Sequence, residues 1–176
     1  MSYDILLEEL YRDGDLCIVN KPCGLPSQAD RSGDPSVVDA PQLKGALGVP
    51  HRLDRPVSGA LVVALSAAGL SGMSALFRDR RVKKTYWAMV QGQVDEAFVL
   101  RHTLEHSGRQ RRAVVKGEGQ GNAVVHVRRL VQADRYALVE VVPEGGAFHQ
   151  IRAQLGAAGL PIKGDVKYGA RRGERD

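Results

Sequence analysis

The feature that most constrains the fold of this chain is a charged segment that runs directly into a short apolar run. Residues 51–59 have the sequence His-Arg-Leu-Asp-Arg-Pro-Val-Ser-Gly, and residues 60–65 have the sequence Ala-Leu-Val-Val-Ala-Leu. An apolar run of this length, with β-branched residues at its centre and Gly59 and Ser66 at its ends, is typical of a buried strand. The charged residues therefore lie on a loop that a core strand holds in place, where functional side chains are common.

Asp54 lies near the middle of this loop, between Arg52 and Arg55. A carboxylate flanked by guanidinium groups is expected to be ionised and oriented, as a nucleophile or an anion-sensing group requires. Alternatively, the same residues form an ion-pair cluster on the surface, worth about 0–1 kcal/mol. The residues alone leave both interpretations open.

Hydrophobic periodicity predicts a strand-rich chain with two clear helices. One helix begins after Ser66, with Ala67, Leu70, Met73, Leu76 and Phe77 as a core-packing stripe, and another covers residues 148–158 and ends at Gly159. The other predicted strands are residues 16–20, 82–91, 123–130 and 136–142. Residues 22–50 are predicted to be mostly loop, and residues 101–120 a long loop or an irregular hairpin. This pattern predicts a mixed α/β fold of the α+β type, in a single domain over residues 1–176 with a frayed tail at 170–176.

The charge of the chain is moderately basic, with 25 Lys and Arg against 20 Asp and Glu. The basic residues gather in two segments, residues 78–84 and residues 101–116, on either side of one predicted strand. Such segments suit a surface that follows RNA phosphates, although a solvated face of a basic protein has the same composition. No apolar run approaches the roughly 20 residues that a membrane helix needs. Cys17 and Cys23 match no zinc or redox spacing, so we expect a cytoplasmic protein.

Four further motifs place the charged loop in a larger pattern. Residues 15–26 form a strand followed by a Lys-Pro-x-Gly turn, and residues 82–92 contain a Lys-x-Tyr-x-Ala-x-Val-x-Gly strand. His149-Gln150-Ile151-Arg152 follows, and residues 159–169 close the series with Gly-Asp-x-x-Tyr-Gly. In this order, and with the loop at residues 51–59, these motifs resemble those of the RluA-type pseudouridine synthases over most of the chain.

The resemblance implies a pseudouridine synthase fold, which is a largely antiparallel mixed sheet with a few helices and a central RNA-binding cleft. It implies an isomerase that converts uridine to pseudouridine in structured transfer or ribosomal RNA, with no metal, no other cofactor and no membrane partner. The family's N-terminal RNA-binding module is not expected, and we expect a monomer. In the family pattern, Asp54 is the catalytic carboxylate, Arg152 pairs with it, and Tyr86 stacks on the base.

The resemblance and the distribution of charge also give candidate RNA contacts. Arg52 is expected to flank the flipped nucleotide or to fill the gap that it leaves in the duplex. The other candidate contacts are Lys21, His51, Arg55, Lys84, Arg111, Arg112 and Lys163.

Two positions depart from the family pattern. Gly145-Gly146-Ala147 replaces the usual Thr-Gly-Arg, which removes one basic group, and Val57 replaces the commoner threonine. The first departure favours an alternative function, a non-catalytic RNA-binding or ribosome-assembly module that retains the fold. A second alternative is a metal-dependent phosphoesterase that uses His51, Asp54, His149 and Asp165, but these residues match no metal-ligand signature.

Overall fold

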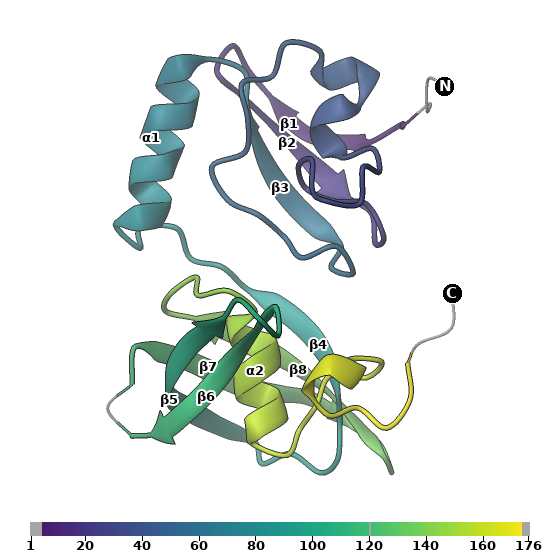
Figure 1. The fold of residues 1–176 in the computed structure, drawn as a ribbon, viewed down its shortest axis with the longest axis vertical. Helices are drawn as coiled ribbons and strands as arrows, with labels where there is room; N and C mark the ends of the chain where they lie inside the picture. The colour runs from purple at the N-terminus through teal and green to yellow at the C-terminus, as the bar shows by residue number, and fades with distance from the viewer. Residues whose placement is uncertain (1–4, 120, 174–176) are drawn as a thin grey trace. The chain divides into compact units, whose positions relative to one another are not determined.

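A computed structural model describes residues 5–119 and 121–173 of the chain, which divides after Val82 into two compact units (Figure 1). Both units combine antiparallel strands with helices, so the predicted α+β class is confirmed. The single domain predicted for residues 1–176 and the central cleft stay predictions.

The first unit is built on a three-stranded antiparallel sheet in the order β1-β2-β3. β1 is Glu8–Arg12, β2 is Leu16–Lys21 and β3 is Gly59–Ala64. Cys17 of β2 lies opposite Val63 of β3, and Val19 lies opposite Leu61; all four side chains are fully buried. The apolar run after the charged loop is therefore the core strand that the sequence predicts.

A helix, α1 (Ala67–Arg78), follows β3, and two short 3₁₀ helices, η1 (Val37–Asp39) and η2 (Pro41–Leu43), lie in the long loop before it. The Ser66 hydroxyl caps α1 by accepting a hydrogen bond from the Gly69 amide at 3.0 Å, as predicted. The apolar stripe of α1 is less buried than predicted. Its side chains are half-buried or exposed, and Gly69 is the one buried residue of this helix. A Cβ at Gly69 would lie 2.4 Å from the Asp15 carbonyl oxygen, so the helix packs through this glycine.

The second unit is built on a five-stranded antiparallel sheet in the order β4-β8-β7-β5-β6. Its strands are β4 (Tyr86–Gln91), β5 (Ala97–Ser107), β6 (Arg112–Glu118), β7 (Ala123–Gln132) and β8 (Tyr136–Pro143). The helix α2 (Gln150–Ala157) packs Leu155 into a valine core formed by β4, β7 and β8, so it covers one face of this sheet (Figure 1).

The region predicted as a long loop or irregular hairpin, residues 101–120, is mostly regular. β5 and β6 pair from His102 opposite Glu118 to Ser107 opposite Arg112, with one irregularity near Leu104. His102 and Leu104 are buried on one face, which is the two-residue period of a strand. One of these buried residues is the polar His102, which conceals the alternation in the sequence.

The end of the chain is packed at the start of the predicted frayed tail. After α2, Gly159 turns the chain with a φ of 74°, as predicted. The 3₁₀ helix η3 (Val166–Tyr168) follows, Ala170 is buried, and Gly173 forms a bridge to Gly164. The tail is therefore packed at Ala170 and exposed at residues 171–173, and residues 174–176 lie outside the described part, so the predicted fraying stays a prediction.

Candidate functional site

The backbone at Asp54 is fixed on both sides. The Ser27 hydroxyl donates to the Leu53 carbonyl at 2.8 Å and accepts from the Leu53 amide at 3.1 Å. On the other side, the Val57 amide donates to the Asp54 carbonyl at 2.9 Å and closes a turn. Ser27 and Leu53 are both buried, so their mutual bonds are shielded from water. The half-buried Asp54 side chain therefore leaves a rigid backbone.

Arg55 fastens the same loop to the turn that follows β2. The Gly24 amide donates to the Arg55 carbonyl at 2.9 Å, and the Arg55 Nε donates back to the Gly24 carbonyl at 2.9 Å. The Arg55 Nη1 also pairs with Asp34 at 2.8 Å. Gly24 has a φ of 84°, a conformation that glycine adopts without strain. Much of the Arg55 guanidinium thus holds the loop, and its RNA contact stays a prediction.

Lys21 does not have the position that a phosphate contact requires. Its side chain is fully buried, and its Nζ donates to the carbonyls of Pro22, Leu25 and Arg55 at 2.9, 2.7 and 3.2 Å. An ammonium has three donors, so these bonds occupy all of them. Burial lowers the pKa of Lys21, an effect that the negative charge of Asp54 partly opposes. We therefore correct the expected role: Lys21 is a structural cation beneath the Asp54 loop.

His51 is also held by its own unit. Its Nε2 accepts a hydrogen bond from the Val62 amide of β3 at 3.0 Å, and its ring stacks on Phe77 of α1 with 4.4 Å between centroids. These contacts anchor the start of the charged loop to β3 and α1. Arg52, the next residue, is exposed. The RNA contacts of both residues stay predictions.

In the second unit, Arg152 of α2 forms a buried ion pair with Asp165. The Arg152 Nε and Nη2 donate to the two carboxylate oxygens of Asp165 at 2.7 and 2.9 Å, which is bidentate geometry. The side chains are 18% and 9% exposed, respectively. Asp165 therefore fixes the plane of the guanidinium, and the pairing of Arg152 with a catalytic carboxylate stays a prediction.

The contacts of His149 define its tautomer. The Arg152 Nη1 lies 3.1 Å from the His149 Nε2, and since a guanidinium only donates, this nitrogen must accept. The proton of neutral His149 is then on Nδ1 and is donated to the Tyr168 hydroxyl oxygen at 2.8 Å. The same oxygen accepts from the Ala113 amide at 2.8 Å. Burial raises the pKa of Tyr168, so its hydroxyl stays protonated at neutral pH.

Tyr86 and Lys84 lie at the start of β4. Tyr86 is half-buried and packs against the valine core, while Lys84 donates to the carbonyl of Gly145. Gly145 belongs to the segment that departs from the family pattern, and this segment is ordered: the Ala147 amide donates to the Gln150 Oε1 at 3.1 Å. A lysine thus lies beside the loop that lacks the family's arginine.

The remaining candidate RNA contacts lie on the surface of the second unit. Lys163 is exposed, with its Nζ 6.0 Å from the centre of the Tyr136 ring. Arg111 is exposed in the β5–β6 turn with a φ of 47°, and Arg112 is half-buried opposite Ser107. Both arginines lie on the β5–β6 hairpin, and their RNA contacts stay predictions.

The metal-site alternative has no support in the described residues 5–119 and 121–173, where no three His, Cys, Asp or Glu side chains gather to hold an ion. Two of its four proposed ligands, His149 and Asp165, both contact the Arg152 guanidinium, whose positive charge opposes a bound cation. In the same described ranges, no helix is long and apolar enough to cross a membrane.

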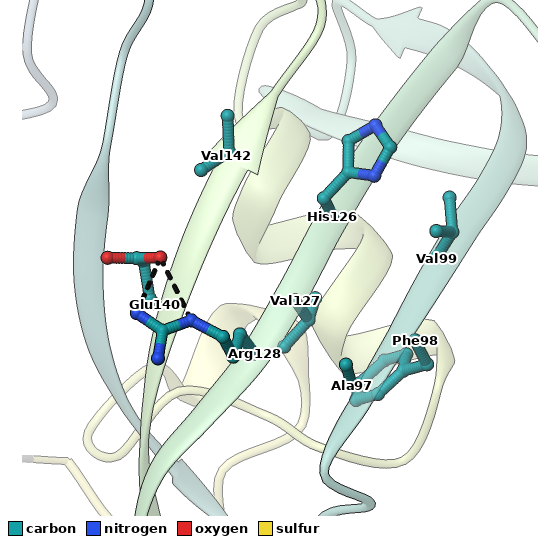
Figure 2. Close-up of a pocket in the computed structure, with 8 residues that line it drawn as sticks. All are labelled: Ala97, Phe98, Val99, His126, Val127, Arg128, Glu140 and Val142. Carbon is teal, nitrogen blue, oxygen red and sulfur yellow. Dashed lines mark hydrogen bonds and ion pairs between the residues drawn. The ribbon is translucent and has the colours of Figure 1, made fainter.

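A pocket of about 380 Å³ opens on the face of the five-stranded sheet opposite α2 (Figure 2). It is lined by residues of β5, β7 and β8, with the Arg128–Glu140 ion pair at 3.0 Å on one side. Its lining includes none of the predicted site residues, so the candidate site lies elsewhere.

Two contributors to the candidate site were missed in the sequence. Ser27 is an ordinary loop serine in the sequence, and nothing nearby indicates that it bonds Leu53. Tyr168 belongs to the closing Gly-Asp-x-x-Tyr-Gly motif, so the motif could have indicated it. Asp165 belongs to the same motif, which gives no sign that it pairs with Arg152.

Comparisons with known proteins identify the family of the chain. A family model described as RNA pseudouridylate synthase matches residues 15–157. The chain is 32% identical over 193 residues to tRNA pseudouridine synthase C of Pectobacterium carotovorum subsp. carotovorum, covering 99% of this chain and 51% of the relative. It is 34% identical over 185 residues to ribosomal large subunit pseudouridine synthase D of Zymomonas mobilis subsp. mobilis, covering 94% and 57%. The chain thus spans just over half the length of these curated relatives.

Among solved structures, human RNA pseudouridylate synthase domain containing 1 is similar to this chain with a TM-score of 0.80 and 26% sequence identity. The match covers 94% of this chain and 71% of that one.

Proposed function

Because the chain belongs to the RNA pseudouridylate synthase family, we propose that it isomerises uridine to pseudouridine in structured RNA, with Asp54 as the catalytic carboxylate. The observation that carries the proposal is the rigid placement of Asp54 by Ser27, Arg55 and Val57. A catalytic group needs its direction fixed before the substrate binds, and these contacts supply that for Asp54.

The reaction cleaves the bond between base and sugar, rotates the base and rejoins it through carbon. Substrate and product have the same atoms, so the overall change is redox-neutral. It requires a carboxylate beside the sugar and base, and a uridine extruded from its stack. Asp54 supplies the carboxylate in our proposal, whichever atom it attacks or deprotonates.

Two other residues take the roles that the family resemblance implies. Tyr86 lies on a strand whose alternate residues are packed into the core, so its ring has a fixed place for stacking on the base. Arg152 is held in one plane by Asp165, which suits a group that must orient a carboxylate. We therefore propose that both act on the reacting uridine.

We propose that the RNA is transfer RNA or ribosomal RNA, because one relative is named for tRNA and another for the large ribosomal subunit. We also propose a cytoplasmic monomer.

The experiment that tests the function is to map pseudouridine in total RNA from cells with and without the gene, and after incubation of unmodified RNA with the purified protein. Loss of one site in the cells and its recovery in vitro support the proposal. Binding of RNA without any new pseudouridine supports the alternative function, a non-catalytic RNA-binding module. The difference from the family pattern at Gly145–Ala147 favours this alternative.

Replacing Ser27 with alanine is expected to lower kcat by about 10–100-fold and to leave KM nearly unchanged. The substitution removes both bonds to Leu53, so the backbone that carries Asp54 loosens without any loss of RNA contact. Steady-state kinetics of pseudouridine formation measure both constants. Ser27→Thr keeps the hydroxyl and should restore kcat, and Ser71→Ala, at an exposed serine of α1, is the control. A kcat unchanged in Ser27→Ala would show that this contact does not position Asp54.

Replacing Arg111 and Arg112 with alanine is expected to weaken RNA binding and to flatten its salt dependence. Each lost phosphate contact should reduce the slope of log affinity against log salt by about 0.7–0.9. Filter binding at several salt concentrations measures the slope, and kcat at saturating RNA should change little. A matched control replaces Arg12 and Arg128, which pair with glutamates on the surface. Equal slopes in the two double variants would show that the hairpin arginines do not contact phosphate.

A further inference from the structure

A ladder of aromatic rings lies at the start of α2. The Phe148 ring stacks on the His149 ring, with 3.8 Å between centroids and 19° between planes. His106 of β5 makes a T-shaped contact with Phe148, with 4.8 Å between centroids and 81° between planes. Phe148 is nevertheless 41% exposed. A large part of this aromatic side chain is therefore open to solvent.

The ladder is held rigid by a closed circuit of contacts. His149 bonds the Tyr168 hydroxyl, and that hydroxyl accepts from the Ala113 amide of β6. Ala113 lies directly opposite His106 in the β5–β6 register, and His106 contacts Phe148, which closes the circuit. His149 has a φ of 51°, an uncommon conformation for a residue other than glycine, and these contacts maintain it. The Phe148 ring is therefore preorganised.

Positive charge is present in the turn that follows His106. The β5–β6 turn next to His106 carries Arg109 and Arg111, both exposed. Lys167 of η3 donates to the Arg111 carbonyl at 2.9 Å and so fastens the turn to the unit that carries the ladder. An exposed aromatic ring suits a nucleobase, and basic side chains in the adjacent turn suit the phosphate attached to it.

We infer that Phe148, supported by His149 and His106, is a stacking platform for an unpaired base next to the target uridine. This inference rests on the proposed function. The link to the target is Arg152, which contacts the His149 Nε2 at 3.1 Å and which the proposed function places beside the reacting uridine. The exposed ring of Phe148 is thus connected to that guanidinium through His149. The platform thus selects RNA whose target uridine has an unpaired neighbour.

The test compares three variants of the full chain, Phe148→Leu, Phe148→Tyr and Trp87→Leu. Leucine keeps apolar bulk but loses the ring, whereas tyrosine keeps the ring. Trp87 is an aromatic side chain on β4, outside the ladder and 72% exposed, so it controls for nonspecific stacking. The measurements are the Kd for total transfer RNA and total ribosomal RNA, and kcat and KM for pseudouridine formation.

Phe148→Leu is expected to raise Kd and KM by about 5–150-fold, the range for loss of one stacked base. Phe148→Tyr and Trp87→Leu should remain within about twofold of the wild type. The slope of log affinity against log salt should not change in Phe148→Leu, because the ring carries no charge. Unchanged Kd and KM in Phe148→Leu, or an equal loss in Trp87→Leu, would overturn the inference.

A second measurement leaves the protein unaltered and so does not depend on the folding of a variant. Once the modified uridine is mapped, a synthetic stem-loop that contains it is made with an abasic residue at either neighbouring position. One of the two abasic substitutions should raise the Kd of the wild-type protein by the same factor as Phe148→Leu raises it for the unaltered RNA. The same abasic substitution should cause no further rise in the Kd of the Phe148→Leu variant. Independent, additive losses would overturn the platform. Absence of pseudouridine with wild-type protein would instead refute the proposed function, while the Kd comparison would still decide whether Phe148 stacks on RNA.

Discussion

Replacing Asp54 with asparagine is expected to lower kcat for pseudouridine formation by about 10³-fold or more, and to change the Kd for RNA only a few-fold. Asparagine has nearly the same shape, and the turn at this position is closed by the backbone carbonyl of residue 54, which the substitution retains. An amide can neither add to the base or sugar nor remove a proton as a carboxylate does. Single-turnover kinetics on unmodified RNA, with chemical detection of pseudouridine, measure the effect.

The control for this variant is Asp79→Asn, which removes an exposed carboxylate that pairs with Arg78 at the end of α1. It changes the net charge of the protein by the same amount, so any general electrostatic effect on RNA binding appears in both variants. Asp79→Asn should react at the wild-type rate. Normal turnover by Asp54→Asn would disprove the assignment of Asp54 as the catalytic carboxylate.

Much of the fold could be predicted because burial follows simple periodicity. Cys17 and Val19 alternate with less buried residues in β2, and the apolar run of β3 pairs with them. The β5–β6 hairpin was not predicted as regular strands, because its buried face includes His102, a residue type that gives no hydrophobic signal. The apolar stripe of α1 was predicted to be buried, but its side chains are half-buried or exposed. Periodicity shows which residues share a face of a helix, and it does not show how completely other elements cover that face.

The candidate site was predictable where a motif identifies a residue, and unpredictable where distant segments converge. Asp54 follows from the charged loop and the family resemblance. Lys21 was expected to be exposed, because the sequence does not indicate that the Arg55 carbonyl, 34 residues later, joins two nearer carbonyls around its ammonium. The Ser27–Leu53 bonds span 26 residues and are equally invisible in the sequence. Such contacts depend on how the loops pack, which no local pattern encodes.

Replacing Asp165 with alanine is expected to lower the free energy of unfolding by about 3–5 kcal/mol, because it leaves the largely buried Arg152 guanidinium without the carboxylate that accepts two of its hydrogen bonds. Asp165→Asn keeps one acceptor oxygen and should cost less. Urea unfolding followed by circular dichroism measures the change. Where the variant is still folded, kcat should also fall, since Arg152 loses the bond that fixes its plane.

The matched control is Glu140→Gln, which breaks the ion pair between β7 and β8 on the exposed face of the same sheet. Its partner Arg128 is 59% exposed, so water replaces the lost carboxylate and the expected cost is at most about 1 kcal/mol. Two features separate the pairs: Asp165 accepts with both of its oxygens and is largely buried, whereas the two Arg128 donors share one oxygen of Glu140, at 3.0 and 3.3 Å, in a more exposed pair. If Asp165→Ala destabilised the protein no more than Glu140→Gln does, Asp165 would not be what holds Arg152 in place, and the proposed orientation of the catalytic carboxylate would need another support.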